Sequence, residues 1–367
     1  MNSPHDLLIQ ALLHPENTRA FSLAQWDDLL RLARSANLLS KLSETLEATD
    51  NLESVPERPG THLLSAKILS DHQQQAIQWE LAHIASALTP LGIPLLLLKG
   101  AAYVHAGLPA ARGRLFGDVD LLVPRAELPR VEATLMLQGW LTDEADAYNQ
   151  RYYREWMHEI PPMVNQRRGT VIDIHHTILP LTAKPNLQPE RLFENARVTS
   201  KESPYQVLSP CDMVIHSATH LFYESELNNG LRDLFDLDSL LRHFASSESN
   251  FWDMLTERAE ALDLVDPVSH AFRYCAQILE TPIPSDALNK ISLKTTTPRF
   301  KTWFLDAAYK RALRPDHTLA SDFWTPSARF MLYLRGHALR MPIPMLVRHL
   351  SRKAVMRLVK SDSHSFE

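Results

Sequence analysis

The sequence predicts an α+β protein in which a small mixed-sheet core is flanked by helical regions on both sides. Two observations predict this class. Leucine and alanine recur at helical spacing through most of the chain, and three short apolar runs near its middle have the length and flanking turns of strands. Because 367 residues suffice for two or three domains, we predict a helical region over residues 1–90, the core over 91–205 and a helical region over 206–367.

The N-terminal region should consist of helices. Apolar residues from Leu7 and from Trp26 onwards follow the periodicity of amphipathic helices. Residues 51–60 are rich in turn formers and predict a loop. A third, long helix is expected over 63–88, before the prolines and glycine of 90–94.

The core should begin with a buried strand at 94–98 that ends in a glycine turn at Lys99-Gly100. The polar, aromatic-rich residues 148–156 predict a connection, and the proline-punctuated residues 177–210 predict irregular structure. The expected order of the remaining elements is a brief helix at 101–106, a strand at 119–123, a helix at 127–137, a strand at 169–175, helices over 212–279 and further helix from residue 300.

Composition narrows the class of protein further. The formal net charge of −5 gives no global signature of nucleic-acid binding. Cys211 and Cys275 are far apart, which excludes a disulfide framework or a zinc ribbon and fits a reducing cytosol. The first residues do not look like a signal peptide, and the most apolar run, 93–98, is far shorter than the ~20 residues of a membrane helix. We therefore predict a cytoplasmic protein without a transmembrane segment.

Two carboxylates stand two residues apart in the apolar run Arg114-Leu-Phe-Gly-Asp118-Val-Asp120-Leu-Leu-Val. In a strand, side chains at i and i+2 point to the same side, so Asp118 and Asp120 should project together. Two like charges in an apolar strand need compensation, which Mg²⁺ with a substrate triphosphate commonly supplies. Asp173 is a lone carboxylate in the next apolar strand and could complete a site for one or two ions, acting on an attacking hydroxyl.

Basic groups flank the acids in the sequence. Lys99 and Gly100 can bring a cation and a backbone amide to phosphate oxygens. Arg112 and Arg114 precede the aspartates and could offset the charge of a polyphosphate, and we favour Arg114.

The order Lys-Gly, Arg-x-x-Gly-Asp-x-Asp and a strand Asp followed by His resembles the nucleotidyltransferase superfamily, and most closely its uncharacterised nucleotidyltransferase branch. This resemblance covers about 93–176 and implies a DNA polymerase β-like core. It also implies that Asp118, Asp120 and Asp173 are catalytic acids and metal ligands. Better-known members carry Gly-Ser at the glycine turn, where this chain has Lys99-Gly100-Ala101. The resemblance further places the nucleotide-binding group near the triphosphate, namely Lys99, Gly100, Arg114 and Gly117.

We therefore predict a metal-dependent enzyme that moves an NMP from an NTP to an acceptor hydroxyl or amine and releases pyrophosphate. Three alternatives stay open: an inactive nucleotide sensor, an RNA-directed transferase that acts on tRNA like a toxin, and a kinase-like γ-phosphoryl transfer. The kinase alternative has no P-loop or kinase signature behind it. The sequence identifies neither the base nor the acceptor, which could be a small molecule, a protein or RNA.

Three further features allow more than one interpretation. One of His175 and His176 should point toward the acids, while His216 and His220, spaced i, i+4, are interpreted as a polar helix face rather than a metal pair. Residues 231–238 predict an ordinary amphipathic helix, although the resemblance allows Arg232 or Asp236 to reach the cleft. Residues 329–360 carry seven lysines and arginines from Arg335 on and no acid. We interpret them as a solvated helix face that balances an otherwise acidic chain, although they could contact nucleic acid, an acidic partner or a membrane surface.

Overall fold

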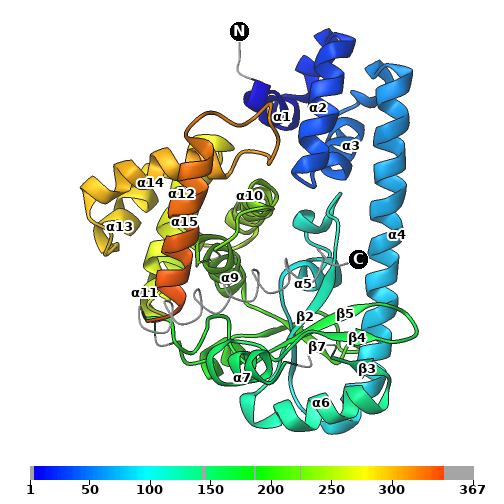
Figure 1. The fold of residues 1–367 in the computed structure, drawn as a ribbon, viewed down its shortest axis with the longest axis vertical. Coiled ribbons are helices and arrows are strands. Elements are labelled where there is room, and N and C mark those ends of the chain that lie inside the picture. Colours follow the sequence, from blue (N-terminus) through cyan, green and yellow to red (C-terminus); the bar gives the residue numbers. More distant parts are fainter. Residues whose placement is uncertain (1–3, 143–145, 186, 224, 343–367) are drawn as a thin grey trace, which may run out of the picture.

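The computed structural model describes residues 4–142, 146–185, 187–223 and 225–342. The N-terminal region is helical, as predicted, and α4 runs along the whole length of one side of the molecule (Figure 1). Ser22 and Gln25 form a reciprocal capping box that fixes the start of the second helix. The helices of this region are α1 (Pro4–Leu13), α2 (Leu23–Ser35), α3 (Leu39–Ala48) and α4 (Glu57–Leu88).

The predicted loop over 51–60 is wrong in its second half, because α4 already begins at Glu57. Pro59 lies in the first turn of this helix, where a missing amide hydrogen costs no intrahelical hydrogen bond. Further along, α4 buries one stripe of its surface against the sheet region and α3. The buried apolar residues of that stripe include Leu63, Ile77, Leu81, Ile84 and Leu88.

Seven strands of the described residues form one mixed sheet in the order β3-β4-β5-β2-β1-β7-β6. Strand β2 is parallel to β5 and β1 is parallel to β7, whereas the remaining neighbours are antiparallel. The sheet and its flanking helices confirm the α+β class. The strands are β1 (Leu95–Leu97), β2 (Asp118–Leu122), β3 (Trp140–Leu141), β4 (Met163–Asn165), β5 (Val171–His175), β6 (Arg197–Val198) and β7 (Tyr205–Val207).

Four of these strands and three helices were not expected. The connection over 148–156 is largely helix α7 (Ala147–Trp156), and the irregular segment over 177–210 contains α8 (Glu190–Glu194), β6 and β7. Strands of two or three residues are too short for an alternating pattern, and β7 exists through its pairing with β1, more than a hundred residues earlier. The strand β7 also lies across the predicted boundary at 205/206, and the domain boundaries remain predictions.

The other helices follow the predicted order, except that residues 285–294 were not predicted as a helix. They are α5 (Lys99–His105), α6 (Leu128–Leu137), α9 (Pro210–Tyr223), α10 (Gly230–Ser247), α11 (Phe251–Ala261), α12 (Val265–Ile278), α13 (Ser285–Lys294), α14 (Arg299–Ala312) and α15 (Thr325–Arg340). Short 3-10 turns occupy Pro15–Ala20, Leu52–Ser54, Thr89–Leu91, Pro109–Ala111 and Arg125–Glu127. Of the basic segment 329–360, α15 carries the first part, and residues 343–360 lie outside the described residues. None of the helices that the structure describes combines the length and the apolar character that crossing a membrane requires.

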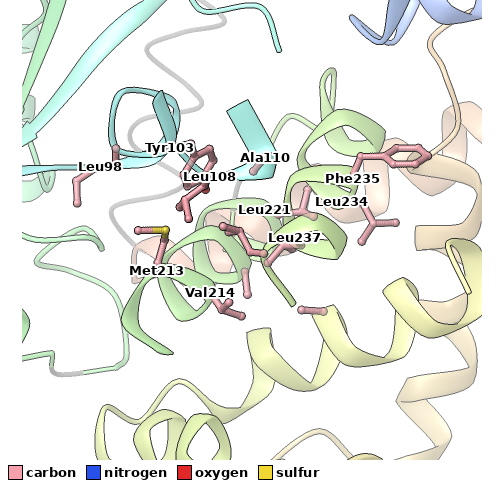
Figure 2. Close-up of a cluster of buried hydrophobic side chains, with 14 of the residues drawn as sticks. Leu98, Tyr103, Leu108, Ala110, Met213, Val214, Leu221, Leu234, Phe235 and Leu237 are labelled. Carbon is pink, nitrogen blue, oxygen red and sulfur yellow. The ribbon is translucent and has the colours of Figure 1, made fainter. Parts of the chain in front are cut away.

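A buried apolar cluster joins the sheet region to the C-terminal helices (Figure 2). Tyr103 of α5 and Leu108, which follows it, lie near Met213 of α9, and residues of α10 such as Leu234 lie further along the cluster. The Tyr103 hydroxyl is also 2.5 Å from the Ser217 hydroxyl of α9. Packing of this kind fixes the turn at Lys99 relative to α9 and α10.

Candidate active site

The three predicted acids lie together on one face of the sheet. Strands β2 and β5 run in parallel with Asp120 opposite Asp173, and Asp118 precedes Asp120 by two residues. Each acid offers one carboxylate oxygen within 4.8 Å of those of the other two. The alternate residues, Val119, Leu121, Ile172 and Ile174, are buried on the opposite face. Strand alternation therefore explains both the apolar pattern and the cluster of acids.

Asp120 is the fully buried member of the three and has two donors on one oxygen. Its Oδ1 accepts a hydrogen bond from Lys99 Nζ at 2.7 Å and lies 2.9 Å from His175 Nε2. Burial alone would raise the pKa of Asp120, but Lys99 and His175 outweigh burial and hold that pKa well below its usual range. The same contact with Asp120 overcomes burial of the ammonium group and raises the pKa of Lys99. Asp120 is thus ionised and held in one orientation.

Asp118 and Asp173 lack such compensation. Loss of hydration to the surrounding protein atoms, followed by the neighbouring charge of Asp120, raises the pKa of both carboxyl groups, that of Asp173 to about 7. Asp173 Oδ1 is buried and has no hydrogen-bond partner among the described residues, whereas Asp118 is exposed. This face of the sheet is therefore short of positive charge.

The predicted glycine turn has an unusual backbone. Lys99 has a φ of 43°, in the left-handed region that residues with a Cβ seldom adopt. A Cβ added to Gly100 would lie 2.5 Å from Arg114 Nη1 and 2.7 Å from the Phe116 ring, so only glycine fits. At Gly117, by contrast, an added Cβ would meet no atom within 4 Å. Gly100 thus lies directly beside Arg114, while Gly117 borders open space.

Arg114 is anchored to the C-terminal helices. Its Nε donates to Asp236 Oδ2 of α10 at 2.8 Å, and its guanidinium lies over the Phe116 ring at 5.2 Å. Asp236, which the sequence left open as a cleft residue, therefore reaches the glycine turn through Arg114. Arg232 pairs instead with its neighbour Asp233, and Arg112 is exposed.

Helices α3 and α4 hold the loop that precedes the acids. Gln73 Oε1 accepts from the Phe116 amide at 2.9 Å, and Gln74 Nε2 donates to the Ala111 carbonyl at 2.9 Å. Lys41 Nζ donates to the Arg112 carbonyl at 3.2 Å. The N-terminal helices thus position the Arg-x-x-Gly-Asp-x-Asp segment.

Of the two histidines after the third acid, His175 faces the site, and His176 instead lines a cavity of about 820 Å³ with Arg125 and Phe193. The interpretation of His216 and His220 as a polar helix face is wrong for His216, which is 3% exposed. Burial first, and then Lys99, lowers the pKa of His216 to about 3. Within the described part of the chain, neither histidine belongs to a group that could share an ion.

Sequence reasoning missed Glu159 and His158. Both lie just after α7, and Glu159 pairs with His175 across an isolated antiparallel bridge. Burial raises the pKa of Glu159, and the nearby His175 and Lys99 oppose that rise. No motif marks these residues, because their place beside β5 depends on a backbone pairing that the sequence pattern does not show.

A mixed sheet that presents three carboxylates from two neighbouring strands defines a candidate transferase site. The model of the uncharacterised nucleotidyltransferase family matches residues 22–280. The chain belongs to this family, which confirms the resemblance seen in the sequence and supports nucleotidyl transfer as the general activity. None of the curated proteins compared with the chain matches it.

Proposed function

We propose that the protein transfers an NMP from an NTP to an acceptor hydroxyl or amine, releases pyrophosphate and depends on one or two Mg²⁺ ions. The observation that carries this proposal is the group formed by Asp118, Asp120 and Asp173 on one face of β2 and β5. Family membership supports the transfer reaction in general.

The donor set fits Mg²⁺. This ion prefers oxygen ligands, and the site offers three carboxylates without an intervening nitrogen. The unpaired buried oxygen of Asp173 and its raised pKa show a local deficit of positive charge that a divalent ion would fill. When bound, Mg²⁺ supplies charge that neutralises the triphosphate and eases deprotonation of an attacking hydroxyl.

The residues of the chain then take separate roles. Asp118 is exposed and accessible to an incoming nucleotide, whereas Asp120 is held in orientation by Lys99 and His175. Asp173 helps to activate the nucleophile. Lys99, the Gly100 amide, Arg114 and Gly117 contact or border the triphosphate, with Arg114 held beside Gly100 by Asp236.

The test is to incubate the purified protein with Mg²⁺, host lysate and each NTP, labelled in parallel at the α- and γ-phosphate. We expect transfer of the α label only. The Asp118→Ala variant should lose it, while Asp71→Ala, which removes an exposed acid of α4, should retain it. Transfer of the γ label alone would make the protein a kinase. NTP-dependent thermal stabilisation without transfer of either label would favour the sensor alternative.

One observation favours an RNA acceptor as a second candidate. The basic helix α15 ends at Arg340, whose carbonyl accepts from Thr182 Oγ1 at 2.6 Å. The charge of Arg340 also acts on Glu159, which neighbours the acids. A polyanionic acceptor would find positive charge on this side of the site. This candidate predicts salt-sensitive RNA binding that is lost when the residues after about Arg329 are removed.

A further inference from the structure

A second group of potential ligands lies beside the three acids and contains two imidazoles. His158, Glu159 and His175 each offer one ligand atom within 4.8 Å of the others. Glu159 Oε2 is 3.5 Å from His175 Nδ1 and 3.6 Å from His158 Nε2. One carboxylate oxygen therefore faces one nitrogen of each imidazole.

Backbone pairing brings these residues together. Glu159 and His175 are opposite each other in the antiparallel bridge. The Ile160 amide donates to the Ile174 carbonyl at 3.0 Å, and the His176 amide donates to the His158 carbonyl at 2.9 Å. The arrangement is therefore imposed by the main chain and does not require attraction between the three side chains.

Asp120 determines how the His175 ring is used. The oxygen of the Asp120 carboxylate is the acceptor in the contact of 2.9 Å, so the Nε2 of His175 carries the hydrogen. In the neutral ring the lone pair of Nδ1 is then directed at Glu159 Oε2. His175 is 1% exposed, and its Nδ1 has no hydrogen-bond partner in the described part of the chain. Two acceptors that face each other in a buried place are compensated either by a shared proton or by a bound cation.

The spacing of the group matches coordination by a small ion. Metal–ligand bonds of 2.0–2.1 Å in a tetrahedron place ligand atoms about 3.3 Å apart and the centres of two bound imidazoles about 5 Å apart. The distances from Glu159 Oε2 to the two nitrogens are 3.5 and 3.6 Å. The ring centres of His158 and His175 are 5.2 Å apart. Small side-chain adjustments would complete the geometry.

We propose that His158 Nε2, Glu159 Oε2 and His175 Nδ1 form a site for Zn²⁺ or a similar late first-row divalent ion, distinct from the three-acid site. Imidazole donors favour such ions, whereas Mg²⁺ prefers oxygen. Lys99 and Arg340 are nearby cations, but Glu159 and the three aspartates outnumber them. His175 would bind the ion through Nδ1 and keep its Nε2 hydrogen on Asp120, as metal-bound histidines commonly do. The bound ion would thereby restrain the His175 ring and the orientation of Asp120.

The proposal is tested by titrating metal-stripped, full-length protein with Zn²⁺ against a chromophoric chelator, with Mg²⁺ in large excess. We expect one Zn²⁺ per chain. The His158→Gln and Glu159→Gln variants should each bind it at least about tenfold more weakly. Two variants serve as matched controls that should bind Zn²⁺ like the wild type: Asp118→Asn in the three-acid site and His72→Ala, an exposed histidine of α4. Co²⁺ provides a second readout, because a tetrahedral N/O site gives a visible absorption that His158→Gln should abolish.

The proposal is overturned if the wild type binds no stoichiometric Zn²⁺, or if both glutamine variants bind it like the wild type. It is equally overturned if Asp118→Asn abolishes binding while His158→Gln and Glu159→Gln leave it intact, since the ion would then lie on the acids. Thermal unfolding in the presence of chelator identifies any variant that fails to fold, and the other glutamine variant then decides. Because the titration needs no nucleotide, its outcome is independent of the transfer reaction.

Discussion

The three acids of the site differ in how their charge is compensated. Asp120 has an ammonium group and an imidazole on one oxygen, Asp118 is open to solvent, and Asp173 has a buried oxygen without a partner. Because only the charge of Asp120 is compensated within the protein, a bound cation would be most favourable beside Asp118 and Asp173. The pKa directions of the three carboxyl groups follow this order.

Asp173→Asn should stabilise the metal-free protein at neutral pH. The pKa of Asp173 is about 7 in the fold, above its ordinary value of 3.8. Because this pKa is raised, the protonated carboxyl group of Asp173 contributes its full stability below pH 3.8. This contribution to the free energy of unfolding is lost as the pH rises through 7. In chelator, the free energy of unfolding of the variant should therefore exceed that of the wild type by on the order of 1–2 kcal/mol at pH 8. Urea unfolding at several pH values measures the difference.

At pH 4 the two proteins should differ little, which provides the internal control. Mg²⁺ should raise the stability of the wild type at pH 8 more than that of the variant, because the amide is a weaker ligand than the carboxylate. Equal stabilisation by Mg²⁺ would contradict a role of Asp173 at the ion.

Gly100→Ala should destabilise the protein by about 1–3 kcal/mol. Its new methyl group would overlap the Arg114 guanidinium, which is held by Asp236, and the ring of Phe116, whose backbone amide is held by Gln73. Gly117→Ala is the matched control, since its methyl group meets no atom within 4 Å and should change stability by less than about 0.5 kcal/mol. Thermal unfolding of both variants gives the comparison. A stable Gly117→Ala variant with weakened NTP binding would support the assignment of Gly117 to the nucleotide site.

At the scale of elements, the loop between Pro109–Ala111 and β2 is held from two directions. Gln73, Gln74 and Lys41 contact it from α3 and α4, and Asp236 contacts it from α10. The glycine at 113 in the same loop has a φ of 64° and lies against the backbone of Ser40 and Lys41, so this contact also excludes a side chain. The helical regions on both sides of the sheet therefore both position the segment that carries the acids.

Arg114→Leu should lower the free energy of unfolding by about 3 kcal/mol, because it leaves Asp236 buried without its partner. The double variant Arg114→Leu/Asp236→Leu should recover part of this loss, since no lone carboxylate remains. Arg112→Ala, which removes an exposed neighbour, should stay within about 0.5 kcal/mol of the wild type. Chemical unfolding of the wild type, Arg114→Leu, Asp236→Leu and the double variant tests whether the pair acts as a unit. Additive losses would show that Arg114 and Asp236 do not depend on each other.

At the scale of the whole molecule, α4 joins the N-terminal helices to the edge of the sheet. Its Glu80, 2% exposed, receives two hydrogen bonds of 2.8 Å from Arg168, which precedes β5. The Arg168 guanidinium also lies over the Trp140 ring of β3 at 4.8 Å. This contact connects segments that are nearly ninety residues apart.

Glu80→Ala should therefore destabilise the protein by about 2 kcal/mol, as expected when a partly buried guanidinium loses its hydrogen-bonded partner. Glu155→Ala breaks the exposed pair of Glu155 with Arg151 and should cost less than about 0.5 kcal/mol. Denaturant unfolding monitored by tryptophan fluorescence compares the two. Equal effects would contradict a specific role for the contact between α4 and the sheet edge.

The sequence by itself determined the acids of the candidate site. Asp118 and Asp120 in one apolar run, and Asp173 in another, must project from one face of their strands, because strand geometry alternates side chains. It also predicted the long helices, whose periodicity extends over many residues, and the family. These features are local: each is encoded within ten or twenty consecutive positions.

Only the tertiary structure decided which residues surround those acids. Glu159, His158 and Asp236 come from segments without a motif, and each reaches the site through a contact with a distant part of the chain. The short strands β6 and β7 depend in the same way on partners far along the sequence. Such contacts are fixed by the packing of the whole chain around one core, and no local pattern of residue types contains that information.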